Sequence, residues 1–85
     1  MANTPEKEIQ KIFGEVLRTN RVSKSISQEE LAFRAGVDRT FISRIERGLR
    51  QPTITSLINL GPALETTAAR LVAEAEAIYR KNKNR

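Results

Sequence analysis

Residues 28–46 read QEELAFRAGVDRTFISRIE, a stretch in which two short amphipathic helical patterns meet at a glycine. In the first pattern, Leu31 and Ala35 fall four residues apart on one helical face. Gly36 follows at the point where a left-handed backbone would end the helix, a conformation that glycine adopts without steric cost. Two helices joined by so short a turn predict a helix-turn-helix unit.

The residues that flank the two patterns are typical of helix starts. Ser27 is followed three residues later by Glu30, which fits a capping box at the start of the first helix. Asp38 is a favourable N-cap for the second helix. The apolar positions of the second helix predict an inward face made of Phe41, Ile42 and Ile45.

The other face of the second helix is polar and cationic, which two packed helices with no further role would not require. Arginine forks to the edge of guanine, and hydroxyl groups bond to phosphates or bases. We therefore interpret this face as a DNA-binding surface. Its members are Arg39, Thr40, Ser43, Arg44 and Arg47.

The positive charge of the chain is concentrated on the same region. The chain has 85 residues and a net charge of +5, and residues 18–50 hold eight basic and four acidic side chains. Such an excess on a recognition element indicates a polyanionic partner, here double-stranded DNA. The length and the apolar content of 39% predict one domain over residues 1–85 with a single helical core. Residues 1–5 and 82–85 are expected to be disordered.

The composition argues against an enzyme and against a membrane protein. The chain has no Cys and no His, so it lacks a thiolate metal site, a disulfide framework and an imidazole that could activate a serine. No apolar run is long enough to span a bilayer, and the N-terminus is too polar for a signal peptide. We expect no cofactor, metal, small-molecule ligand or membrane partner, and a location in the cytoplasm with the nucleoid.

The run SQEELAFRAGVDRTFISRIERGLRQPTITSL, residues 27–57, resembles the Cro/repressor-type (XRE-like) helix-turn-helix family. The phrase DRTFIS…IERG is also similar to controller proteins of restriction–modification systems. The resemblance extends from about residue 14 to residue 64. It implies an all-α, compact five-helix bundle of the phage-repressor type that binds operator DNA as a homodimer.

Matched residue by residue to the family's motif, the helix at 39–47 would lie in the major groove with its N-terminal half toward the bases. Gln28 would hold a backbone phosphate at the start of the preceding helix. Arg39 would make a bidentate contact to guanine, whereas the role of Arg44 stays open between a base and a phosphate. The base-reading set is Arg39, Thr40, Ser43 and Arg44, and the other phosphate-binding candidates are Lys24, Arg47 and Arg50.

The resemblance also bears on an ion pair and on two turns. It implies a pair between Arg21 and Glu46, for which the alternative is two separate surface charges. Ser25 and Glu65 stand where the family commonly has glycine, and the geometry of the turn at Ser25 is left open.

Three more helices are predicted outside the motif from apolar residues at helical spacing. Thr4 is predicted to cap a first helix that begins at Pro5 and ends at Arg21, and Gly14 is expected to permit close packing against another helix. Thr53 is predicted to cap a fourth helix whose apolar positions are Ile54, Leu57, Ile58 and Leu64.

Two features of the C-terminal half remain ambiguous in the sequence. The pair Gly61-Pro62 predicts a kink or a break near Leu60, because proline removes a helical hydrogen bond and clashes one turn back. Thr67 is predicted to cap a last helix with one apolar stripe. Such a stripe fits either core packing or a homodimer interface, and we favour the interface because a terminal helix on a small domain covers only part of its apolar face within the chain. The stripe consists of Leu71, Val72, Ala75, Ile78 and Tyr79.

The sequence therefore predicts a sequence-specific transcriptional regulator that binds an inverted-repeat operator as a homodimer. The alternatives are a helical protein-interaction module, such as an antitoxin-like partner, and a nonspecific nucleic-acid-binding protein. Within the regulators, a controller protein, a prophage-type repressor and an antitoxin stay open, and the phrase DRTFIS favours the controller. No residue distinguishes an activator from a repressor.

Overall fold

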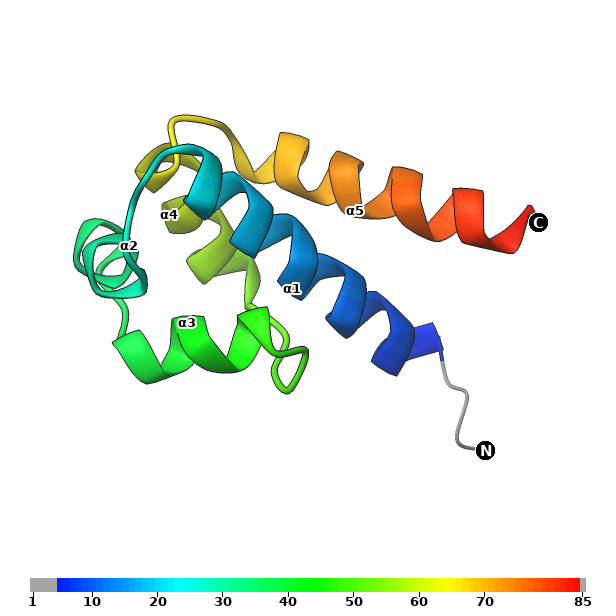
Figure 1. The fold of residues 1–85 in the computed structure, drawn as a ribbon, viewed down its shortest axis with the longest axis horizontal. Coiled ribbons are helices and arrows are strands. Elements are labelled where there is room, and N and C mark those ends of the chain that lie inside the picture. Colours follow the sequence, from blue (N-terminus) through cyan, green and yellow to red (C-terminus); the bar gives the residue numbers. More distant parts are fainter. Residues whose placement is uncertain (1–4, 85) are drawn as a thin grey trace.

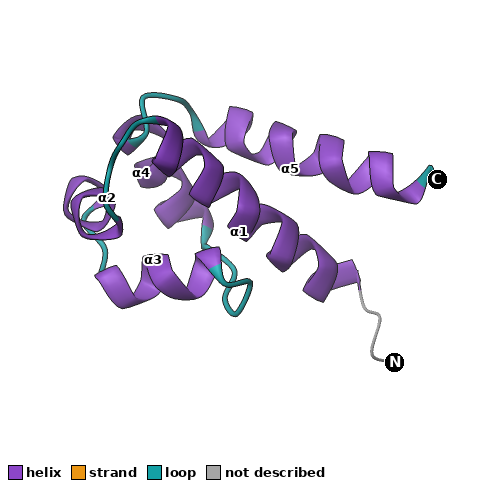
Figure 2. Ribbon diagram, viewed as in Figure 1, coloured by secondary structure: helices purple, strands orange, loops and turns teal. Residues whose placement is uncertain are grey.

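The computed structural model describes residues 5–84, which form five α-helices and no β-strand (Figure 1, Figure 2). The predicted all-α, five-helix architecture is confirmed. The helices are α1 (Pro5–Ser23), α2 (Gln28–Ala35), α3 (Arg39–Glu46), α4 (Ile54–Ala63) and α5 (Ala68–Lys83).

The core forms around α1, which packs against α3 and α5, while α4 packs against α2 and α5. Every helix contributes apolar side chains to this single cluster. Full burial of each large aliphatic side chain contributes about 1.5–3 kcal/mol relative to exposure. The most deeply buried of them are Leu17, Leu31, Ile42, Ile45, Leu60, Leu64 and Leu71.

The predicted N-caps lie at the predicted positions. The hydroxyl oxygens of Ser27, Thr53 and Thr67 each accept a hydrogen bond from the backbone N–H three residues ahead, at 2.9, 3.0 and 3.1 Å. Asp38 occupies the N-cap position of α3, but its side chain makes no capping hydrogen bond. The three short-range bonds fix where α2, α4 and α5 begin.

The observed ends of the first and last helices differ in part from the predicted ends. Pro5 is the first residue of α1, as predicted, whereas Thr4 lies outside the described residues. The helix continues beyond Arg21 to Ser23, and α5 runs to Lys83, so residues 82 and 83 are helical rather than disordered.

Ser25 and Glu65 adopt the left-handed backbone that the family usually gives to glycine. Their φ values are 58° and 60°, close to the 70° of Gly36, which ends α2 as predicted. The left-handed region costs a residue with a side chain about 1–2 kcal/mol. The turn at Ser25 therefore keeps the family's geometry with a less suitable residue.

Of the predicted kink or break near Leu60, the break does not occur, because α4 runs without interruption through Pro62 to Ala63. Pro62 is the penultimate residue of the helix, so its missing N–H removes a bond only in the last turn. Gly61 has a separate role, since a Cβ there would lie 2.5 Å from the backbone nitrogen of Ala68. The absence of a side chain at Gly61 lets α5 start directly against α4.

The apolar positions predicted for α4 do not all face the core. Leu57 and Leu64 are buried, but Ile54 and Ile58 are 71% and 59% exposed. The face of α4 that meets α2 and α5 is centred on Leu60, and both isoleucines lie to one side of it.

Candidate nucleic-acid interface

The position of α3 is set by its close crossing with α1 at Gly14. A Cβ at Gly14 would collide with the carbonyl oxygen of Ile45 and would lie 2.8 Å from the carbonyl oxygen of Glu46. The expectation that Gly14 permits close helix packing is confirmed. Because the contact is made by backbone atoms, it holds α3 at a fixed distance from α1.

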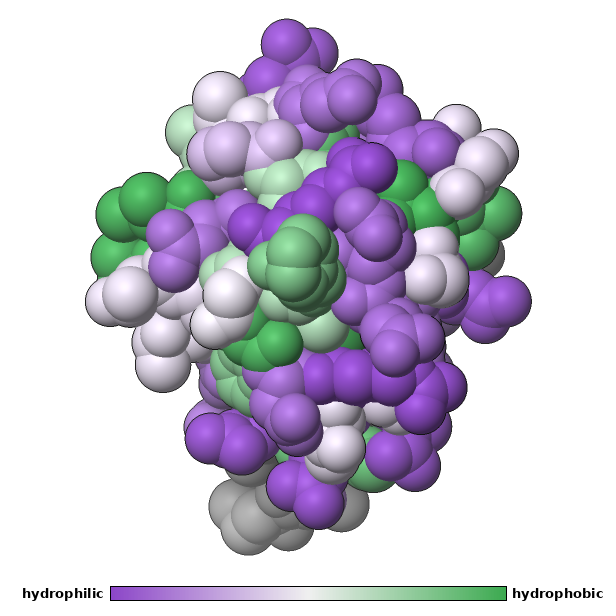
Figure 3. All heavy atoms as spheres, turned by 90° about the vertical axis from the view of Figure 1, so that its left-hand side faces the viewer, coloured by the Kyte–Doolittle hydropathy of each residue, from purple (hydrophilic) through white to green (hydrophobic). Residues whose placement is uncertain are grey.

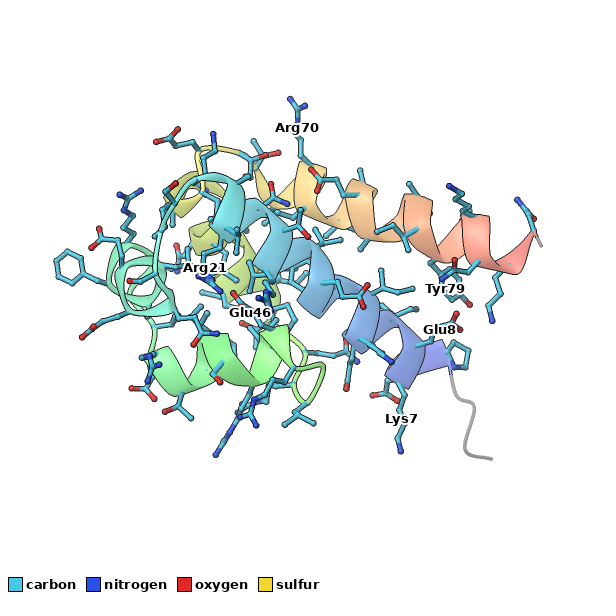
Figure 4. The ribbon with its side chains drawn as sticks, viewed as in Figure 1. Lys7, Glu8, Arg21, Glu46, Arg70 and Tyr79 are labelled. Carbon is cyan, nitrogen blue, oxygen red and sulfur yellow. The ribbon has the colours of Figure 1, made fainter. Side chains whose placement is uncertain are left out.

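Glu46 joins the first three helices through its buried carboxylate (Figure 4). Arg21 Nε donates to one carboxylate oxygen at 2.6 Å, and Arg21 Nη2 donates to the other at 3.0 Å. Gln28 Nε2, at the start of α2, donates to the second oxygen at 3.0 Å. Arg21 and Glu46 thus form a bidentate ion pair, with side chains 13% and 4% exposed, and are not separate surface charges.

The remaining donor of Arg21 ties the pair to the turn before α2, since Nη1 donates to the carbonyl oxygen of Ile26 at 2.8 Å. The hydrogen bond to Glu46 raises the pKa of the Arg21 guanidinium, although burial acts in the opposite direction. Arg21 therefore stays charged throughout the working pH range.

The side of α3 that points away from the core is uncovered. Arg39, Thr40, Arg44 and Arg47 are exposed and Ser43 is half-buried, whereas the inward Ile42 and Ile45 are completely buried. We call these five residues, Arg39, Thr40, Ser43, Arg44 and Arg47, the α3 face.

The electrostatics of the α3 face are cationic. Within residues 5–84, none of its three arginines forms an ion pair with a carboxylate. Figure 3 views the side of the molecule that carries α2, and its lower half, where α3 lies, is mainly hydrophilic. An exposed helix with unneutralised arginines suits a polyanionic ligand.

Two further groups border the α3 face, one at each edge. At one edge a shallow hollow of about 350 Å³ lies between Gln28 and Arg39, and Arg21, Ser27 and Glu29 complete its lining. At the other edge the guanidinium of Arg50 lies over the ring of Phe41, 5.4 Å from the ring centre.

Lys24 does not join this surface. Its Nζ lies 3.4 Å from a carboxylate oxygen of Glu65, in the turn between α4 and α5. Figure 1 shows the turn after α1 beside the turn after α4 at the top of the view, whereas α3 lies at the bottom. This placement does not support the predicted phosphate-binding role of Lys24, because its charge is partly neutralised and faces elsewhere.

Comparison with known proteins identifies the family of the chain. The Helix-turn-helix family matches residues 17–71, which is more than half of the sequence. The chain belongs to this family. The function that follows from this membership is that of a DNA-binding transcriptional regulator.

The relatives of this helix-turn-helix protein include control proteins. It is 38% identical over 65 residues to the control protein C.SmaI of Serratia marcescens, covering 76% of this chain and 77% of the relative. It also resembles the crystal structure of the restriction-modification controller protein C.AhdI of Aeromonas hydrophila. That similarity has a TM-score of 0.71 and 37% identity, and it covers 73% of this chain and 94% of the other.

A third similar structure contains DNA. It is the restriction-modification controller protein C.Esp1396I, solved as a tetramer in complex with its natural 35 base-pair operator. The TM-score is 0.68 at 34% identity, and the match covers 79% of this chain and 93% of the other. These relatives are regulators rather than enzymes.

The structure brings one part of α1 close to the segment that follows α3, a placement that sequence reasoning missed. A Cβ on Gly48, just after α3, would lie 3.1 Å from the Cα of Lys11, so the N-terminal half of α1 borders the α3–α4 segment. In Figure 4 the side chain of Lys7 projects from α1 toward the side on which α3 lies. No local pattern in the sequence distinguishes these lysines from solvated surface charges.

The five residues predicted to form a dimer interface on α5 differ in how far the rest of the chain buries them. Leu71 is completely buried in the core of the same chain, which does not support a role for it in the interface, whereas the buried Ala75 also lines the groove beside α5. Val72 and Ile78 are 45% and 37% exposed. Tyr79 is half-buried against the core, with the Lys83 ammonium 5.3 Å from its ring centre.

A groove of about 430 Å³ runs beside α5 and is lined mainly by apolar side chains. It lies between α1, α5 and the segment before α4. Its apolar wall includes Ile9, Phe13, Pro52, Leu57, Val72 and Tyr79.

Within residues 5–84, no helix is both long and apolar enough to cross a bilayer. The same residues contain no cluster of acidic side chains arranged to hold a metal ion.

Proposed function

We propose that this protein regulates transcription by inserting α3 into the major groove of an operator. The observation that carries this proposal is the α3 face, an uncovered cationic face on a helix that is locked to α1 and α2 by the buried Glu46 carboxylate. A rigid support is needed because base contacts must be placed accurately before they can discriminate between sequences.

The proposed roles follow from position on this surface. Arg39, at the N-terminal end of α3, would fork to a guanine edge, and Thr40 and Ser43 would contact neighbouring bases. Arg44 would contact a base or a phosphate. Phosphates would be bound by Gln28, which borders the same hollow as Arg39, and by Arg47 and Arg50.

Substitution of Arg39 by alanine is expected to weaken binding to the preferred duplex by about 1–3 kcal/mol and to relax one base position. The side chain is exposed, so the melting temperature should not change. Selection from a random duplex library, with wild type and variant in parallel, measures the change in base preference.

The matched control is Arg70→Ala. Arg70 is an exposed arginine on α5, and its side chain points away from α3 in Figure 4. This variant should retain the base preference of the wild type. An unchanged preference in Arg39→Ala would remove Arg39 from the readers.

We further propose that the protein binds an inverted repeat as a homodimer, with half-site centres about 34 Å apart. The oligomeric, operator-bound relative supports this arrangement. The proposed contact is the groove beside α5, with Val72 at its edge, occupied by a second copy of the chain. No member of the α3 face lines this groove, so both copies would keep their recognition helices free.

Val72→Glu is expected to convert the dimer into a folded monomer, because a charge would be buried against the apolar groove of the partner. Sedimentation equilibrium at several protein concentrations measures this change. Val22→Glu is the matched control, since Val22 is 54% exposed on α1 and lies outside the groove. Equal dimerisation of the two variants would reject the groove as the interface.

Within the regulators, we propose a controller of restriction–modification genes. The control-protein relatives favour this subclass over a prophage-type repressor or an antitoxin. The neighbouring genes test it, since a restriction endonuclease and a methyltransferase should be encoded beside this gene. We also propose that the protein acts on DNA in the cytoplasm and has no catalytic activity.

A further inference from the structure

Phe41 lies at the boundary between the α3 face and the core. Successive residues of a helix point about 100° apart, which places Phe41 next to Arg44 and on the opposite edge of α3 from Glu46. Its ring is half-buried and packs against the core cluster. The guanidinium of Arg50 lies over this ring, 5.4 Å from the ring centre.

Arg50 lies on a segment that has little support of its own. The turn after α3 is closed by two backbone bonds, from Gly48 N–H to Ile45 O and from Leu49 N–H to Arg44 O, each 2.9 Å long. Residues 50–53 then run without regular structure to the start of α4. A long side chain on such a segment loses much rotamer freedom when it binds a ligand, unless it is already held in place.

A cation that lies over an aromatic ring is attracted by the electrons of the ring face. This attraction uses no hydrogen bond, so the N–H donors of the guanidinium stay free for another ligand. A carboxylate partner would instead occupy those donors and cancel the charge. Phe41 can therefore hold Arg50 in place and leave it able to bind an anion.

We infer that Phe41 is a positioning residue: its ring holds the Arg50 guanidinium at the edge of the α3 face, ready to bind a backbone phosphate beside the bases that α3 contacts. This inference rests on the proposed DNA binding. It assigns to Phe41 a role in affinity beyond its contribution to the core.

The test is a double-mutant cycle on the full chain with Phe41→Leu, Arg50→Gln and the variant that carries both changes. The probe is a fluorescent random-sequence DNA duplex titrated at several salt concentrations. Arg50→Gln should weaken binding severalfold and reduce the slope of log Kd against log salt by about 0.9, the value for one lost phosphate contact. Phe41→Leu should also lower the binding affinity and the salt slope. In a protein that already carries Arg50→Gln, adding Phe41→Leu should have no further effect on either.

Phe41→Tyr is the conservative control, because it keeps the ring and should keep wild-type affinity and salt slope. Additive losses in the cycle, or a Phe41→Leu variant with an unchanged salt slope, would show that Phe41 is only a core residue and would overturn the inference. Failure of the wild type to bind the duplex would overturn the proposed function as well, so the two failures are distinguishable.

A second measurement does not depend on the folding of any variant. In the NMR spectrum of the free wild-type protein, the side-chain protons of Arg50 near the guanidinium should be shifted upfield by the ring current of Phe41. The corresponding protons of Arg47, which lies over no ring within residues 5–84, provide the reference. Resonances of Arg50 at the same position as those of Arg47 would contradict the inference.

Discussion

Replacing Glu46 by alanine is expected to lower the free energy of unfolding by about 3–5 kcal/mol. The Glu46 side chain is 4% exposed and accepts hydrogen bonds from Arg21 and Gln28. Without it, the guanidinium of Arg21, 13% exposed, keeps its charge but loses its counter-charge. Since domains are stable by only about 5–15 kcal/mol, this loss would bring so small a protein close to unfolding.

Urea denaturation at fixed protein concentration measures this loss, and two further variants separate its causes. Glu30→Ala removes an exposed carboxylate that pairs with Arg34 at 2.8 Å, and it should cost about 1 kcal/mol or less. The double variant Arg21→Met/Glu46→Leu removes both buried charges and should regain most of the lost stability. Equal losses for Glu46→Ala and Glu30→Ala would contradict a structural role for the buried network.

Gly14→Ala is expected to lower the free energy of unfolding by about 3 kcal/mol. The added methyl group would meet the carbonyl oxygens of Ile45 and Glu46, which belong to the backbone of α3. Backbone atoms cannot rotate away as a flexible side chain can, so the whole of α3 must move from α1. Such a movement would also misplace Glu46 relative to Arg21 and should weaken DNA binding.

Gly36→Ala provides the control for this substitution. A Cβ at Gly36 meets nothing within 4 Å, and its cost arises from the left-handed backbone at φ 70°, about 1 kcal/mol. Thermal melting of both variants should therefore show the larger decrease for Gly14→Ala. Similar decreases would mean that the crossing of α1 and α3 tolerates a side chain.

The starts of the helices and the exposed, cationic side of α3 could be predicted from the sequence, because both depend on short-range geometry. The N-cap hydroxyls of Ser27, Thr53 and Thr67 bond to an amide three residues ahead, so each signal is complete within one turn. The division of α3 into a buried and an exposed side likewise follows from the helical period. Lys24 shows the limit of this reasoning, since its partner Glu65 is 41 residues away and its charge faces away from α3.

Three pairs of residues show which features of the fold and of the candidate site could not be predicted from the sequence, because they depend on packing between distant segments. Leu71 and Val72 are adjacent and similarly apolar, yet one is buried and the other is 45% exposed, because the positions of α1 and α4 determine which part of α5 is covered. Ile58 and Leu60 differ in the same way on α4. The position of the Arg50 guanidinium over the Phe41 ring depends on the path of the segment after α3. The helical period determines the direction in which each side chain points. It does not determine which helix that side chain contacts, because the contacts depend on the close packing of the whole core.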